Sequence, residues 1–305
     1  MPEQDPGTLP YYTRPGIMTS AGRFAPLFDV LPRGVPALAG IAQGLLIHEH
    51  VAHAYGRTLS DEDHAAVHIR RVEELLERIA ARDPRPLDTA RPLPDRIPAN
   101  CGHFSVLMVA MLRAQGTPAR ARCGFAGYLG AGTFEDHWVC EYWNSGERRW
   151  DLVDAQLDAR QRMMFRIDFD PTRVPRDRYL TAGEAWRRCR AGTADPERFG
   201  LRLRKRAGLW WIAGNLMRDA AALGGVELLP WDAWGAMPRP HETIDDERAA
   251  FFDGLAALTG TPDTGFDALR RLGEEDARLR VPEKVYNALR EREEAIPRTG
   301  EARAV

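Results

Sequence analysis

The stretch PANCGHFSVLMVAMLRAQG, residues 98–116, is nearly all apolar, yet it begins with a cysteine, a glycine and a histidine. Its apolar residues leave no consistently polar face, which is typical of a helix that is buried on all sides. Gly116 and Pro118 are typical of a helix end. The sequence therefore predicts a buried central helix that starts at Cys101.

The position of Cys101 allows two interpretations. The first turn of a helix leaves backbone N–H groups unpaired, and the positive end of the helix dipole favours a thiolate over a thiol. Gly102 would let another group approach the sulfur closely. Considered alone, however, a cysteine in an apolar helix is more often a packing residue. A reactive role needs a base and a group that orients the base.

His137 and Asp154 are the candidates for these two roles. His103 is a poor base, because it lies two residues along the same helix and roughly opposite the cysteine around the axis. A two-residue turn at 145–146 would place His137 directly across a hairpin from Asp154. Asp151 would then point to the opposite face of the sheet.

Strand-like and helical segments surround this constellation. The runs expected to form strands are ARARCGFAGYL (119–129), HWVCEYW (137–143) and RRWDLVDAQL (148–157). The runs expected to be helical are GLLIHEHVAHAYG (44–56), DEDHAAVHIRRVEELLERIAA (61–81), GEAWRRCR (183–190), GLWWIAGNLMRDAAALGG (208–225), DERAAFFDGLAALTG (246–260) and EKVYNALREREEA (283–295). We expect an N-terminal helical region (1–95), a catalytic core (96–170) and a C-terminal helical region (171–305).

Three segments in this order resemble the catalytic core of the transglutaminase-like superfamily, which is related to papain-like cysteine enzymes. The resemblance rests on a cysteine that opens a helix ending in LRAQGTPAR (112–120), a strand with His next to Trp, and a Trp four residues before an Asp. Two features depart from the family pattern. Trp138 follows the histidine immediately rather than one residue later, and Ala155-Gln156 replaces the usual Pro-Thr after the aspartate.

The resemblance implies an α+β fold in which an antiparallel sheet packs against the Cys101 helix, with helical extensions at both ends. It also implies that Cys101 attacks an amide or ester carbonyl, His137 shuttles the proton and Asp154 holds the imidazole tautomer. The backbone N–H of the cysteine would contribute to an oxyanion hole. The resulting thioester would pass to water or to an amine. The expected substrate-binding residues are Asn100, His103 and Trp138.

Other functions are weighed against this one. A catalytically silent transglutaminase-like scaffold that binds a partner is the alternative, and it has no physical need for all three residues. The cluster IHEHVAH fails the zincin pattern, because Ala52 stands four residues after His48. His50 and His53 could share a face, but no third ligand is evident, so neither a metal nor a cofactor is expected.

Composition narrows the class of partner. A net charge of −2 gives no general attraction to nucleic acid or to an acidic membrane. The N-terminus lacks the pattern of a secretory signal, and four widely spaced cysteines argue against disulfides or a zinc knot. We expect a cytoplasmic protein with a peptide or small-molecule acyl substrate, a mobile tail from Glu294 and an oligomeric state that the sequence leaves open.

Overall fold

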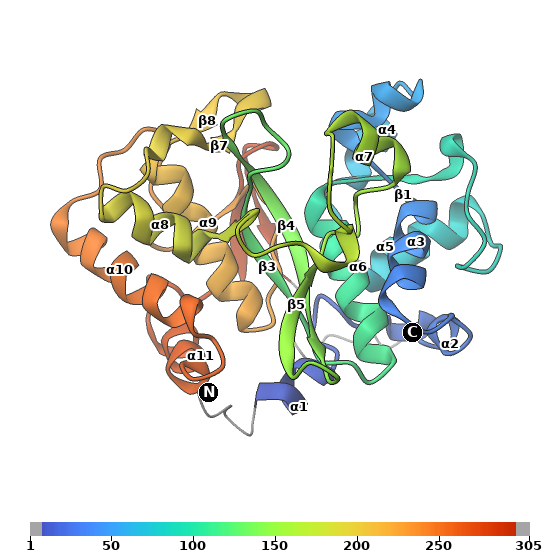
Figure 1. Ribbon diagram of the computed structural model, residues 1–305, viewed down its shortest axis with the longest axis horizontal. Coiled ribbons are helices and arrows are strands. Elements are labelled where there is room, and N and C mark those ends of the chain that lie inside the picture. The colour runs from blue at the N-terminus through green and yellow to red at the C-terminus, as the bar shows by residue number, and fades with distance from the viewer. Residues whose placement is uncertain (1–7, 297–305) are drawn as a thin grey trace. The chain divides into compact units, whose positions relative to one another are not determined.

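The computed structural model describes residues 8–296 (Figure 1), and part of the expected mobile tail lies outside them. The chain divides into two compact units. Among the described residues, unit 2 contains Leu9–Ala121 and Trp138–Arg176, and unit 1 contains Thr8, Arg122–His137 and the chain from Asp177 to Ile296. The division into regions 1–95, 96–170 and 171–305 stays a prediction.

Unit 2 is built around one buried helix. Its helices are α1 (Thr8–Thr13), α2 (Pro26–Asp29), α3 (Val35–Leu45), α4 (Asp61–Ala66), α5 (Val72–Arg82), α6 (Cys101–Ala114) and α7 (Ala159–Met164). All residues of α6 except Gly102 and Ala114 are buried, and α3 and α5 pack against it. Gly116 has a φ of 78°, a left-handed conformation that suits glycine and ends the helix. The predicted central helix is confirmed.

Two short strands lead the chain to the start of α6. Strand β1 (Leu46–His48) pairs in parallel with β2 (Ile97–Ala99), and β2 runs directly into Asn100. The prediction of one helix over 44–56 is therefore wrong beyond residue 45. The three residues of β1 are all buried, which suits a strand inside the fold, and a 3₁₀ helix over Glu49–Tyr55 follows.

Unit 1 contains the helices of the C-terminal part. Its elements are β6 (Tyr179–Thr181), α8 (Ala182–Arg190), β7 (Phe199–Leu201), β8 (Arg206–Ala207), α9 (Leu209–Leu223), β9 (Asp232–Ala233), α10 (Asp246–Gly260), α11 (Phe266–Glu275), β10 (Lys284–Asn287) and β11 (Arg292–Ala295). Helices α8, α9 and α10 pack on one another (Figure 1). The helical prediction is wrong for 283–295, where β10 and β11 form an antiparallel pair and β10 also pairs with β9.

The largest sheet has the strand order β6-β3-β4-β7-β8, with β5 paired to β4. Strands β3 (Ala119–Ala126) and β4 (Phe134–Asn144) each contribute residues to both units, whereas β5 (Arg149–Val153) belongs to unit 2. All eight residues of β3 are buried. Buried helices and a largely antiparallel sheet confirm the predicted α+β class. Within residues 8–296, no helix has the length and apolar character needed to cross a bilayer.

Candidate active site

Cys101 is the first residue of α6, directly after the N-cap residue Asn100. Its side chain belongs to unit 2 and is buried, with the whole residue 7% exposed. Helix α6 has 14 residues. The sulfur therefore lies at the N-terminal end of the helix, where the aligned peptide dipoles favour a negative charge.

A reciprocal capping box fixes the start of α6. The Oδ1 atom of Asn100 accepts a hydrogen bond from the backbone N–H of His103 at 3.3 Å, and Nδ1 of His103 accepts one from the backbone N–H of Asn100 at 3.1 Å. The cap uses the N–H of the third helical residue. The N–H groups of Cys101 and Gly102, which precede it, are not used by the cap and are available for an oxyanion.

His103 is held inside the protein by both ring nitrogens. Its Nε2 lies 2.8 Å from the backbone oxygen of Ile69, so the hydrogen-bond pattern assigns the proton to Nε2. Burial lowers the pKa of His103 to about 4, which makes the ring neutral at pH 7. The ring thus supports the helix start and has no nitrogen left over for a substrate.

Gly102 and Trp138 lie close together in unit 2. A Cβ atom on Gly102 would stand 3.0 Å from Oδ1 of Asn100 and 4.0 Å from Cγ of Trp138. Glycine at 102 therefore leaves room for the cap. The Trp138 indole is 1% exposed, and its N–H meets no acceptor among the described residues. The roles of Asn100 and Trp138 in substrate binding stay predictions.

His137 lies in the part of β4 that belongs to unit 1, and it is 2% exposed. The ring of Tyr128 meets its imidazole edge to face, with ring centroids 6.1 Å apart. The hydroxyl of Tyr179 is 3.1 Å from the backbone oxygen of His137 and 3.0 Å from that of Arg122. Burial raises the pKa of Tyr179 well above its ordinary value, so the phenol keeps the proton that it donates.

Asp154 lies in unit 2, just beyond the end of β5, and is 1% exposed. The predicted hairpin register is wrong by two residues. The ladder pairs Cys140 with Val153 and Asn144 with Arg149, so it does not place His137 directly opposite Asp154. Asp154 lies beyond Val153, the last paired residue of β5, so the ladder assigns it no partner on β4.

The cause of the shifted register is the turn. The side chain of Asn144 accepts a hydrogen bond from the backbone N–H of Glu147 at 3.1 Å, which bends the chain around Ser145 and Gly146. The residue in the left-handed conformation is Arg148, with a φ of 51°, rather than Gly146. The hairpin therefore turns one residue later than the sequence indicates.

The three predicted catalytic residues are distributed over the two units, with Cys101 and Asp154 in unit 2 and His137 in unit 1. The triad stays a prediction. Across residues 8–296, no three His, Cys, Asp or Glu side chains are grouped as metal ligands would be.

Sequence reasoning missed the buried polar residues that follow Asp154. Gln156 and Gln161 are 4% and 3% exposed and hydrogen-bond to each other. Two signals were available. Gln156 stands at a position that departs from the family pattern, and Asp158 precedes Gln161 by three residues, which is the spacing of an N-cap and its third helical residue.

Comparisons with known proteins find a family model that matches the segment with the candidate site. Residues 53–155, which include all three predicted catalytic residues, match the family model described as the transglutaminase-like superfamily. A solved structure described as "a Putative Cysteine Protease from Cytophaga hutchinsonii" is similar at 18% sequence identity with a TM-score of 0.31. The match covers 50% of this chain and 45% of that chain, so it spans less than half of the other protein. No curated protein matches the sequence.

Proposed function

We propose that the protein is a cysteine-dependent enzyme that forms a thioester with an amide or ester substrate. The match of residues 53–155 to the model of the transglutaminase-like superfamily suggests cysteine-based catalysis. The observation that carries the proposal is the position of Cys101 at the first residue of a capped, 14-residue buried helix. That position places the sulfur beside backbone N–H groups that can stabilise an oxyanion.

In the proposed reaction, His137 takes the thiol proton of Cys101, Sγ bonds to the carbonyl carbon of the substrate, and the carbonyl oxygen becomes an oxyanion near the first N–H groups of α6. The C–N or C–O bond to the leaving group then breaks, and the leaving group takes a proton from His137. Water or an amine attacks the thioester, gives a proton to the imidazole and releases the thiol. Asp154 orients the imidazole throughout.

Cys101, at the start of α6, fits the role of the nucleophile better than the other cysteines do. Cys123 and Cys140 are fully buried in strands, and burial raises the pKa of the Cys140 thiol far above its ordinary value. Cys189 lies on α8, where burial raises its pKa to about 11. Thiols with raised pKa values are poor nucleophiles at neutral pH.

The test combines alkylation with intact mass measurement. At pH 6, iodoacetamide should label Cys101 much faster than Cys189, as read from peptide masses. A panel of peptide and small-molecule acyl donors should yield a covalent adduct that persists in Cys189→Ala and is absent in Cys101→Ala. Offering a primary amine to that adduct separates transfer from hydrolysis. If Cys101→Ala keeps every acyl-directed activity, or Cys101 labels no faster than Cys189, the scaffold alternative replaces the enzyme.

A further inference from the structure

The backbone around Asp154 is fixed at two points within unit 2. The N–H of Asp154 donates to the backbone oxygen of Pro171 at 2.8 Å. Its side-chain Oδ1 accepts a hydrogen bond from the backbone N–H of Gln156 at 3.0 Å. A carboxylate held through one oxygen cannot rotate freely, so the position of the Gln156 backbone sets the direction of the other oxygen.

Gln161 in turn holds Gln156 through two hydrogen bonds. The Nε2 of Gln161 donates to the backbone oxygen of Gln156 at 3.1 Å, and the Nε2 of Gln156 donates to Oε1 of Gln161 at 2.9 Å. Because both side chains are buried, losing either one leaves a desolvated polar group without its partner. The side-chain amides of Gln156 and Gln161 therefore act as a clamp. They hold the backbone of Gln156, whose N–H contacts the Asp154 carboxylate.

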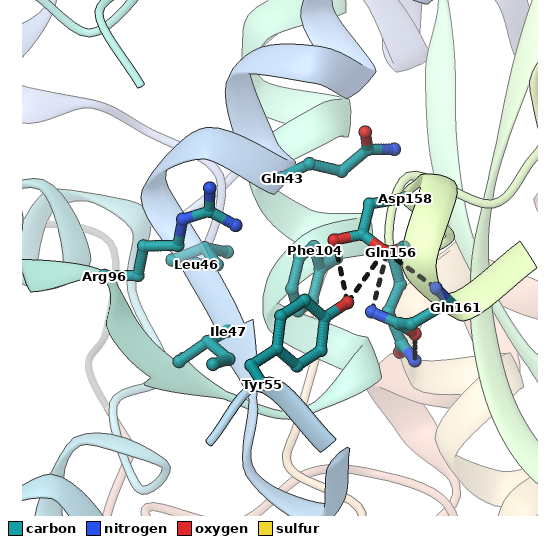
Figure 2. A pocket seen from close by; sticks show the side chains of 9 residues that line it. All are labelled: Gln43, Leu46, Ile47, Tyr55, Arg96, Phe104, Gln156, Asp158 and Gln161. Carbon is teal, nitrogen blue, oxygen red and sulfur yellow. Dashed lines mark hydrogen bonds between the residues drawn. The ribbon is translucent and has the colours of Figure 1, made fainter. Parts of the chain in front are cut away.

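The clamp is tied to the N-terminal part of unit 2 through Asp158 (Figure 2). Asp158 is the N-cap of α7, and its Oδ1 accepts from the backbone N–H of Gln161 at 2.9 Å. The hydroxyl of Tyr55 lies 2.7 Å from each oxygen of the Asp158 carboxylate. Burial, reinforced by this hydrogen bond, raises the pKa of Tyr55 far above its ordinary value, so the phenol stays a donor.

A second contact secures the same segment. The side chain of Gln43, from α3, donates to the backbone oxygen of Leu157 at 3.3 Å. Figure 2 shows Gln43, Tyr55 and Gln161 arranged around the side chains of Gln156 and Asp158. Residues more than a hundred positions apart in the sequence thus converge on the five residues that begin with Asp154.

We propose that Gln156 and Gln161, tied to Tyr55 through Asp158, are positioning residues that hold the Asp154 carboxylate in the orientation that catalysis requires. The inference rests on the proposed function, since it assigns these residues a part in the same reaction. An oriented carboxylate stabilises the imidazolium form of the base, and the imidazolium stabilises the Cys101 thiolate. Loosening the clamp should therefore weaken the thiolate in mildly acidic solution.

The experiment measures the rate of iodoacetamide labelling at Cys101 from pH 5 to pH 10, resolved by peptide mass. For Gln156→Ala, which keeps the backbone N–H, we expect the midpoint to rise by about one pH unit, which is roughly tenfold slower labelling at pH values well below both midpoints. At pH 10 the rate should equal that of the unchanged protein. Labelling of Cys189 in the same samples is the internal reference, and at each pH its rate should be the same in the variant and in the unchanged protein.

Tyr55→Phe tests the outer tie without disturbing the clamp itself. The phenyl ring keeps the packing, but the Asp158 carboxylate loses the hydrogen bond that the Tyr55 hydroxyl donates. The midpoint should rise in the same direction by a smaller amount, on the order of threefold slower labelling at pH values well below both midpoints. Gln115→Ala is the matched control, because it removes a glutamine that also bonds to a backbone oxygen, that of Pro32, elsewhere in unit 2.

The outcomes separate the two proposals. If the unchanged protein labels readily at pH 6 and the profiles of Gln156→Ala and Tyr55→Phe superpose on it, the positioning role is wrong and the proposed function stands. A profile that falls equally at every pH indicates general damage and also overturns the positioning role. If Cys101 of the unchanged protein titrates like Cys189, the proposed function fails, and the positioning role fails with it.

Discussion

The surroundings of Cys101 and of His137 are stabilised by different chemistry. At the start of α6, the buried polar groups are the Asn100 amide and the imidazole of His103, which is neutral at pH 7. In unit 1, Tyr179 hydrogen-bonds to the backbone oxygens of both His137 and Arg122, and the Arg122 side chain forms a buried ion pair with Asp219. The stability of the first region therefore depends on His103 staying unprotonated. The stability of the second depends on the Arg122 and Asp219 side chains staying paired.

The charged cluster joins the unit 1 part of β3 to α9. Nε and Nη2 of Arg122 donate to the two carboxylate oxygens of Asp219 at 3.0 and 2.9 Å, and Nη2 also donates to the backbone oxygen of Thr259 at 3.0 Å. Asp219 is fully buried and accepts a further bond from the backbone N–H of Cys123 at 2.9 Å. The pair is bidentate and shielded from water, where charge-assisted hydrogen bonds are strongest.

The largest predicted effect follows from removing one member of this pair. Asp219→Ala leaves the Arg122 guanidinium buried without its counter-charge, and the free energy of unfolding should fall by about 3–5 kcal/mol. Urea unfolding at pH 7 measures it. Glu274→Ala, which breaks an exposed ion pair with Arg270 on α11, is the control and should cost about 1 kcal/mol or less. Equal losses for the two variants would contradict the view of unit 1 as a cluster of interdependent charges.

The next largest effect is a loss of stability at low pH, and it tests the role of the neutral His103 at the start of α6. The pKa of His103 is about 4 in the folded protein, whereas the ordinary value for a histidine exposed to water is 6.5. Unfolding therefore takes up a proton between these values, and stability falls as pH falls through this window. Between pH 7.5 and pH 4.5 the loss due to His103 should reach about 2–3 kcal/mol.

His103→Gln isolates that contribution. Glutamine can fill the third position of a capping box without carrying a titratable ring. Urea unfolding of both proteins at a series of pH values should show a steeper acid loss for the unchanged protein, and the two curves should run in parallel above pH 7. Curves that stay parallel down to pH 4.5 would show that the neutral imidazole is not the acid-sensitive element of this region.

The sequence predicts a helix correctly where the signals for its start and end are local. The helix over 101–114 is confirmed because its signals are local: a capping residue before it, apolar residues throughout and a glycine in the left-handed conformation after it. The boundaries of α10, at Asp246 and Gly260, agree with the prediction for the same reason, since the preceding Asp245 caps the helix.

Errors occur where distant pairing overrides local periodicity. The segment 283–295 has helical spacing, yet β10 pairs with β9 some fifty residues earlier. The side chain of Asn287 accepts from the N–H groups of Leu289 and Arg290, and Glu291 takes a left-handed φ of 51°, so the chain turns into a hairpin. The contacts of Gln43 with Leu157 and of Tyr55 with Asp158 could not be predicted, because these partners lie more than a hundred positions apart in the sequence.

The smallest predicted effect tests the cap of α6. Asn100→Ala removes the acceptor for the N–H of His103 and also the donor to the backbone oxygen of Val67, which lies 3.4 Å away. We expect a loss of about 1 kcal/mol in the free energy of unfolding, whereas Asn100→Ser, which retains a capping oxygen, should lose only a few tenths. Urea unfolding at pH 7.5, where His103 is neutral, measures both. If the alanine and serine variants lose the same amount, the side-chain cap contributes little, and burial of the α6 helix itself must hold Cys101 in place.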